Sequence, residues 1–119
     1  MRVIMVEPRK IAYVTEIGDD LKSMQKVVGG LIQAVYPFDE LVTLVCNEEG
    51  KITGLPLNRA LYDDKGDIYD IISGTFFVCG LSDDNFVSIP DGLINKFLEK
   101  FHDPEVFMKI GEKIIAIKE

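Results

Sequence analysis

The chain has 119 residues, of which 47% are hydrophobic and 28% are charged, and its formal net charge is −7. This length is close to the commonest size of one domain, and the apolar content suffices for a core without metal or disulfide staples. We therefore expect a single domain over residues 1–119. The acidic balance argues against direct nucleic-acid binding, which needs a basic face to neutralise phosphates.

The apolar residues are too dispersed for a membrane span or a secretory signal. No apolar run approaches the roughly 18 residues that a spanning helix needs. The apolar stretch after Arg2 is only four residues long, and no small-residue cleavage site follows it. We expect a soluble, cytoplasmic protein with no membrane partner. Cys46 and Cys79 are then expected to be buried and reduced, since the cytoplasm keeps thiols reduced.

Two short β-forming runs and a helix are predicted at the start of the chain. Residues 2–7 and 11–17 are rich in apolar and β-branched side chains, so we expect them to pair as an antiparallel hairpin. The acidic pair at 19–20 can accept hydrogen bonds from the free amides of a helix start. Apolar residues recur at helical spacing over 21–28, and the glycine pair at 29–30 ends that helix.

The middle of the chain alternates β-forming runs with turn signals. Residues 31–38 predict a strand, and the continuous β-forming run over 41–46 predicts a buried central strand. The turn residues at 47–50 separate this run from a short segment at 51–53. A second hairpin is therefore expected between 41–46 and 51–53.

The pattern breaks down over residues 54–70, where glycine, proline and aspartate interrupt it. We predict an irregular segment with a short helical turn over 57–62, and long irregular segments in compact domains are frequently functional. The acidic group at 63–67 is expected to form a turn, because its register does not match that of a helix-loop-helix calcium site. A strand over 75–79 and a turn over 80–85 are expected next.

The last third of the chain contains the clearest helical pattern. Ser88 is expected to cap a helix whose broad apolar stripe runs from Ile89 to Phe101. A further helical turn over 105–110, ending at Gly111, and a short strand over 114–117 follow. The elements predict an α+β fold, with a mainly antiparallel β-sheet of about five to six strands and two main helices packed on it. We expect the two helices to cover one face.

Groups that carry common enzyme chemistry are scarce in the sequence. His102 is the only histidine, and its place at the end of a predicted helix favours an interaction with the helix dipole over catalysis. Two cysteines and one histidine fall short of the four ligands of a structural zinc site. The acidic residues lie mostly in turns. We expect no metal and no cofactor, and enzymatic activity is disfavoured, although carboxylate chemistry stays open.

One constellation between residues 47 and 59 suggests a binding site. Asn47 and Glu48 follow the predicted central strand, and Asn58 and Arg59 follow the proline of the next segment. Two amides and an arginine on irregular backbone can hydrogen-bond a partner or a small anion. In the alternative interpretation Asn47 lies in a turn, Asn58 caps a helical turn, and Arg59 pairs with a nearby acid. Both interpretations stay open.

Three segments resemble a known family. They read LVCNEEGK at 44–51, GLPLNRAL at 54–61 and DIISGTFFV at 70–78, and the Val6-Glu7-Pro8 end of the first strand and the glycine pair at 29–30 fit as well. Together they resemble the domain of unknown function 3846 family. The resemblance implies a small bacterial protein of the kind often carried by phages, plasmids or other mobile elements. It implies no activity and no functional residues.

These observations favour a non-enzymatic binding or interaction protein, an accessory factor of a phage or mobile element. The alternative is a protein that binds or sequesters a small ligand, a nucleotide or an anion, through the region 47–59. The expected partner is accordingly a protein or a small molecule. A homo-oligomer also stays open, because an exposed sheet edge invites pairing with a second copy.

Overall fold

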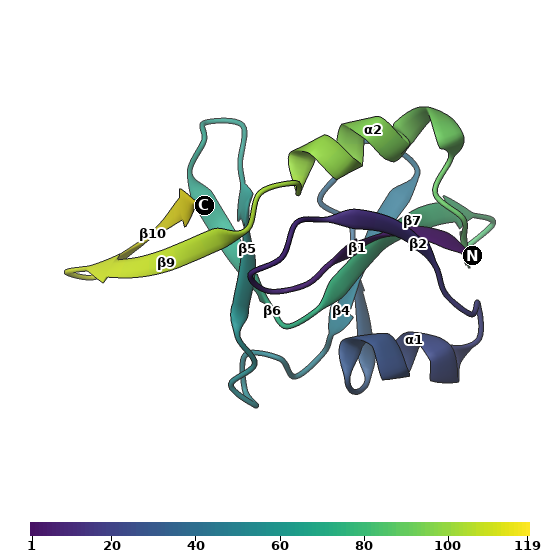
Figure 1. Ribbon diagram of the computed structural model, residues 1–119, viewed down its shortest axis with the longest axis horizontal. Coiled ribbons are helices and arrows are strands. Elements are labelled where there is room, and N and C mark those ends of the chain that lie inside the picture. The colour runs from purple at the N-terminus through teal and green to yellow at the C-terminus, as the bar shows by residue number, and fades with distance from the viewer.

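The computed structural model describes all residues from 1 to 119, with ten strands and two helices (Figure 1). Six strands form the main sheet in the order β2-β1-β7-β4-β3, with β8 pairing the end of β7, and all pairs are antiparallel. Its strands are β1 Arg2–Val6, β2 Tyr13–Glu16, β3 Ile32–Val35, β4 Val42–Asn47, β7 Phe76–Ser82 and β8 Asn85–Val87. The predicted α+β class and antiparallel sheet are confirmed.

Two further hairpins stand beside the main sheet. One consists of β5 Leu57–Tyr62 and β6 Ile68–Ser73, and the other of β9 Glu105–Ile110 and β10 Lys113–Lys118. The second hairpin, here called the C-terminal ribbon, projects from the body of the molecule (Figure 1).

The helical turns predicted over 57–62 and 105–110 are wrong. Both segments form strands, because a tight turn after each one folds the chain back into a hairpin. The Asp63 carboxylate accepts hydrogen bonds from the amides of Lys65 and Asp67, both at 2.9 Å, and so closes the turn between β5 and β6. Gly111 has a φ of 62° in the two-residue turn of the ribbon. It therefore turns a hairpin and does not end a helix.

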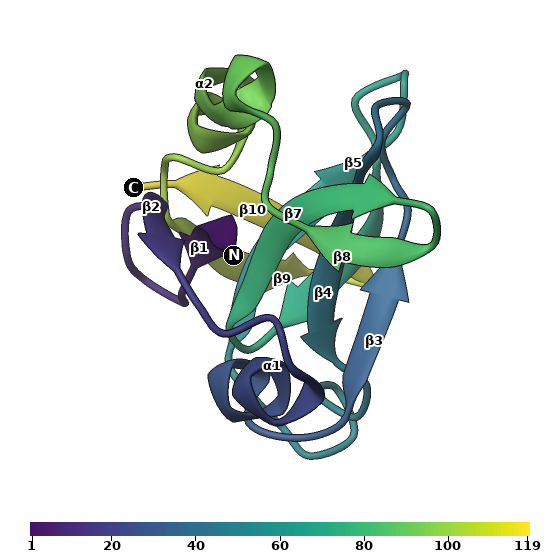
Figure 2. The same ribbon diagram turned by 90° about the vertical axis from the view of Figure 1, so that its right-hand side faces the viewer.

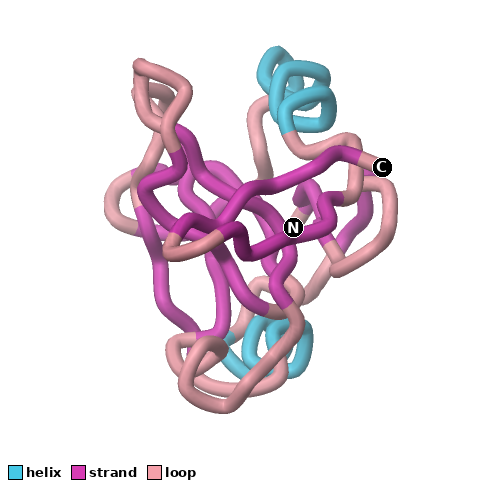
Figure 3. The backbone as a smooth tube through the Cα atoms, turned by 90° about the vertical axis from the view of Figure 1, so that its left-hand side faces the viewer, coloured by secondary structure: helices cyan, strands magenta, loops and turns pink.

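The two helices, α1 Leu21–Val28 and α2 Asp91–Lys100, pack on opposite faces of the main sheet, which corrects the expectation of one shared face. Figures 2 and 3 show them on opposite sides of the strands. The reason lies in β1, where Ile4 and Val6 join the core under α2 while Val3 and Met5 join the core over α1. A sheet that is apolar on both faces must be covered twice. Neither helix is long and apolar enough to cross a membrane.

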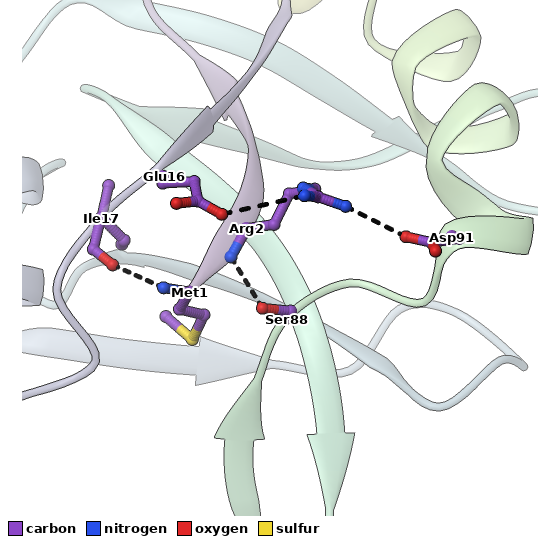
Figure 4. A network of polar contacts seen from close by, with 6 residues as sticks. All are labelled: Met1, Arg2, Glu16, Ile17, Ser88 and Asp91. Carbon is purple, nitrogen blue, oxygen red and sulfur yellow. Dashed lines mark hydrogen bonds and ion pairs between the residues drawn. The ribbon is translucent and has the colours of Figure 1, made fainter.

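The helix starts differ in their caps. The Asp20 carboxylate accepts a hydrogen bond from the Ser23 amide at 3.1 Å, and Gly29 ends α1 with a φ of 81°, as predicted. Ser88 does not cap α2. Its hydroxyl instead accepts a hydrogen bond from the Arg2 amide at 2.8 Å, and α2 begins after Pro90 without a side-chain cap. Figure 4 shows how the N-terminal segment is joined to the segment that leads into α2.

The predicted strand over 51–53 and turn over 80–85 are also corrected. Residues 51–54 form turns, because β4 already pairs with β7 on one edge and β3 on the other, which leaves no edge for another strand. The chain continues as β7 to Ser82, and the turn is limited to Asp83 and Asp84, both with positive φ. Two successive positive φ values match the tight turn of a two-residue hairpin.

The cysteines are free and buried, as predicted. Cys46 belongs to the core under α2 and Cys79 to the core over α1, so the sheet separates them. Burial raises the pKa of Cys79 to about 12. At neutral pH this thiol is therefore protonated and unreactive, since the thiolate is the nucleophile.

Candidate functional site

Arg59, one of the four predicted binding residues, is completely buried and fully hydrogen-bonded by the protein itself. Its Nε donates to the Phe101 carbonyl at 3.2 Å, and its Nη2 donates to the carbonyls of Phe101 and Lys10 at 3.0 and 2.7 Å. Its Nη1 donates to the Asn58 side-chain and backbone oxygens at 2.9 and 3.5 Å. All five N–H groups of the guanidinium are thus occupied.

Asn58 extends this network. Its Nδ2 donates to the carbonyls of Val6 and Gly74, both at 2.9 Å, and its side chain is also completely buried. The pair, here called the Asn58–Arg59 cross-link, joins the end of β1, the β1–β2 turn, the β6–β7 turn and the end of α2. Desolvation lowers the pKa of Arg59, and the charges of Glu105 and Asp103 oppose that shift.

Glu105 is a buried acid that the sequence reasoning missed. It is 5% exposed at the start of β9, and its Oε1 accepts a hydrogen bond from the Ala60 amide at 3.1 Å, which ties the ribbon to β5. Burial raises its pKa, while the Ala60 hydrogen bond and the charges of Arg59 and Lys118 act in the opposite direction. A helical turn was predicted at this position, so its contact with β5 could not be anticipated.

Asn47 and Glu48 lie elsewhere, and no hydrogen bond connects them to the Asn58–Arg59 cross-link. The Asn47 side chain donates to the Val28 carbonyl at 3.1 Å and accepts from the Glu49 amide at 2.8 Å, while Glu48 is exposed in the following turn. Both residues line a pocket of about 300 Å³. Ser73 lines it too, and the Ser73 hydroxyl is the only buried side-chain polar atom without a hydrogen-bond partner.

A larger open groove of about 1000 Å³ lies between the β5–β6 hairpin and β10, and we call it the inter-hairpin groove. Its apolar lining residues are Leu57, Tyr62, Ile68, Tyr69, Ile71, Ile114, Ile115 and Ala116. Its charged lining residues include the ion pair of Lys51 and Asp70, together with Asp67, Glu112 and Lys113. The apolar residues of these walls come from two segments far apart in the sequence, 68–71 and 114–116, and only pairing into two hairpins brings them together.

The lone histidine lies on the surface. His102 follows α2, and its Nδ1 lies 2.7 Å from an oxygen of Asp103. Both side chains are about half exposed, at 53% and 45%. The hydrogen bond to His102 lowers the pKa of Asp103. This position is consistent with the predicted role at a helix end.

We expect Arg59→Met to destabilise the protein by about 3 kcal/mol or more, because it removes the buried guanidinium that donates to the carbonyls of Lys10 and Phe101. The matched control is Arg9→Met, which removes only an exposed ion pair with Glu119 and should cost less than about 1 kcal/mol. Urea denaturation of both variants measures the difference. Equal midpoints would show that the cross-link does not hold the fold together.

Glu105 should make stability depend on pH. Its pKa in the folded state lies above that of the unfolded chain, so the folded protein binds more protons between about pH 4.3 and the folded-state pKa. The contribution of Glu105 to the free energy of unfolding is therefore fully present below this pH window and is lost as the pH rises through it. We expect the free energy of unfolding of wild type, relative to Glu105→Gln, to fall as the pH rises above about 4.3. A flat or rising difference in urea titrations contradicts this.

The family described as "Domain of unknown function (DUF3846)" matches residues 1–102. This range contains the main sheet, both helices and the β5–β6 hairpin, and it stops before the C-terminal ribbon. Searches among curated proteins and among solved structures found no match. Because the matched range spans most of the 119 residues, the chain belongs to the domain of unknown function 3846 family, as the sequence resemblance predicted.

Proposed function

We propose that the protein is a non-enzymatic interaction protein, an accessory factor of a phage or mobile element, which holds an apolar segment of a protein partner in the inter-hairpin groove. The observation that carries the binding role is the groove itself, with its apolar walls on two separate hairpins. The mobile-element role rests on the family resemblance alone.

The exposure of the groove walls supports a protein partner. Tyr69 on β6 is 53% exposed and Ile114 on β10 is 44% exposed. Large apolar side chains that gather in one open depression mark surfaces that another molecule covers. The volume of about 1000 Å³ lies at the upper end of the range of small-molecule pockets, and the groove is open to solvent. Side chains of a polypeptide therefore suit it better than an enclosed small ligand.

Charged residues in the groove lining support selection among such partners. They carry both signs and are Lys51, Asp67, Asp70, Glu112 and Lys113. Exposed charges at an interface contribute more to the choice of partner and to the association rate than to affinity. We therefore infer an apolar partner segment that is flanked by charged residues of both signs.

Co-purification from the host cell tests this proposal with a matched pair of variants. Tyr69→Asp places a charge in the groove, whereas Tyr36→Asp places the same charge at a residue that is 62% exposed outside it. We expect one defined partner to be retained by wild type and by Tyr36→Asp, and to be reduced at least about tenfold with Tyr69→Asp. Absence of any stable partner, or equal retention by both variants, would overturn the proposal.

A second candidate function, small-ligand binding, is favoured by the pocket beside Asn47 and Glu48. The unpartnered Ser73 hydroxyl at this pocket is a group that a polar ligand would satisfy. Of the four predicted binding residues, Asn47 and Glu48 line this pocket, whereas Asn58 and Arg59 do not.

The test is a thermal-shift screen with nucleotides and inorganic anions, on wild type and on Ser73→Ala. Without ligand, Ser73→Ala should be neutral or stabilising by up to about 1 kcal/mol, because it removes an unpaired buried hydroxyl. A bound ligand at about 100 times its dissociation constant should stabilise wild type by about 2.7 kcal/mol, and Ser73→Ala should lose most of that gain. If no compound shifts wild type, or if the shift survives Ser73→Ala, this pocket is not the site.

A further inference from the structure

The outer edge of β10 is an unpaired strand edge with a strongly β-forming sequence. β10 reads KIIAIK and pairs only with β9. Its residues Ile114, Ile115 and Ile117 are between 36% and 45% exposed. A six-residue segment with high β-propensity and without proline or glycine is prone to pair with another strand. The strands at the two ends of the main sheet, β2 and β3, have only four residues each.

The backbone register fixes which groups of β10 point outward. The ribbon closes at the pair Ile110 and Lys113, and the Glu119 amide donates to the Pro104 carbonyl at 2.8 Å. In antiparallel pairs the hydrogen-bonded positions alternate, so the odd-numbered residues of β10 bond to β9. The N–H and C=O groups of Ile114, Ala116 and Lys118 then point away from β9 and are available to another strand.

We propose that the protein forms a two-fold symmetric dimer in which β10 pairs antiparallel with β10 of a second copy, with Ala116 opposite Ala116. The two ribbons then form a continuous four-stranded sheet. This proposal rests on the β10 edge, and three residues of β10, Ile114, Ile115 and Ala116, also line the inter-hairpin groove. The interface lies outside residues 1–102, which match the family.

Charge and apolar complementarity identify the second copy as the occupant. The segment 112–119 has the sequence EKIIAIKE, with a lysine and a glutamate at each end. A register with Lys113 opposite Lys118 cannot form. The backbone N–H and C=O groups of Lys113 are bonded to β9, whereas those of Lys118 point outward, and the backbone groups of antiparallel partners must either both point toward each other or both point away. In the proposed register Lys113 instead lies opposite Glu119, once at each end of the interface. The Glu119 side chain is 40% exposed in its ion pair with Arg9, so it can exchange partners.

The same register matches the exposed apolar residues. Ile115 lies opposite Ile117 of the second copy on both sides of the two-fold axis, in pairs that are not hydrogen-bonded. Side chains approach most closely in such pairs, so both isoleucines lose exposure to water. The small Ala116 lies on the axis, where two copies of one side chain must share the space.

Cysteine cross-linking tests the register. Hydrogen-bonded partners have Cα atoms about 5.5 Å apart, which is within reach of a disulfide. Under mild oxidation, Ala116→Cys should form an inter-chain disulfide in most of the protein. The matched control Lys109→Cys, on β9 of the same ribbon, should form at least about tenfold less. The native Cys46 and Cys79 are buried and do not compete.

Light scattering coupled to size exclusion tests the dimer itself. Wild type at tens of micromolar should have about twice the monomer mass of 13.4 kDa. Ala116→Pro should be monomeric, because it removes an outward N–H that the ribbon itself does not use. Tyr69→Asp, on β6, should remain dimeric, which separates this interface from partner binding at the β6 wall of the groove. A monomeric wild type, or no excess of disulfide formation by Ala116→Cys over Lys109→Cys, would overturn the proposal.

Discussion

The Asn58–Arg59 cross-link is the interaction on which the placement of the hairpins depends. Two adjacent side chains of β5 reach backbone carbonyls at the end of β1, in the β1–β2 turn, in the β6–β7 turn and at the end of α2. A buried guanidinium is costly unless every donor is satisfied, so the four segments must come together around it. Because the buried guanidinium must be fully hydrogen-bonded, it fixes the positions of these four segments relative to one another.

The two-faced main sheet and the cross-link together create the surfaces proposed for function. β1, β4 and β7 use both of their faces for core packing, so α1 and α2 take opposite sides, and α2 shares its core with Leu61 and Ile72 of the β5–β6 hairpin. Glu105 then attaches the ribbon to β5 by one buried hydrogen bond. The ribbon stands off the body, which opens the inter-hairpin groove on one side and leaves the β10 edge free.

Several predictions made from the sequence failed where local pattern and global pairing compete. Residues 57–62 and 105–110 carry few turn or breaker residues, so short-range pattern did not separate a helical turn from a strand. Both segments are strands because each pairs with a neighbouring strand, residues 57–62 with β6 and residues 105–110 with β10. The segment 51–53 failed for the opposite reason, because both edges of β4 were already occupied by β3 and β7.

The sequence alone determined the α+β class, the antiparallel sheet, α1 with its caps, the burial of both cysteines and the family. These follow from side-chain period, turn residues and composition, which act over a few neighbouring positions. Tertiary structure alone decided that Arg59 is saturated with internal hydrogen bonds and that Asn47 and Glu48 lie apart from it. The groove and the β10 edge were decided in the same way. Contacts between residues distant in sequence carry no periodic signal, so they emerge only when the chain folds.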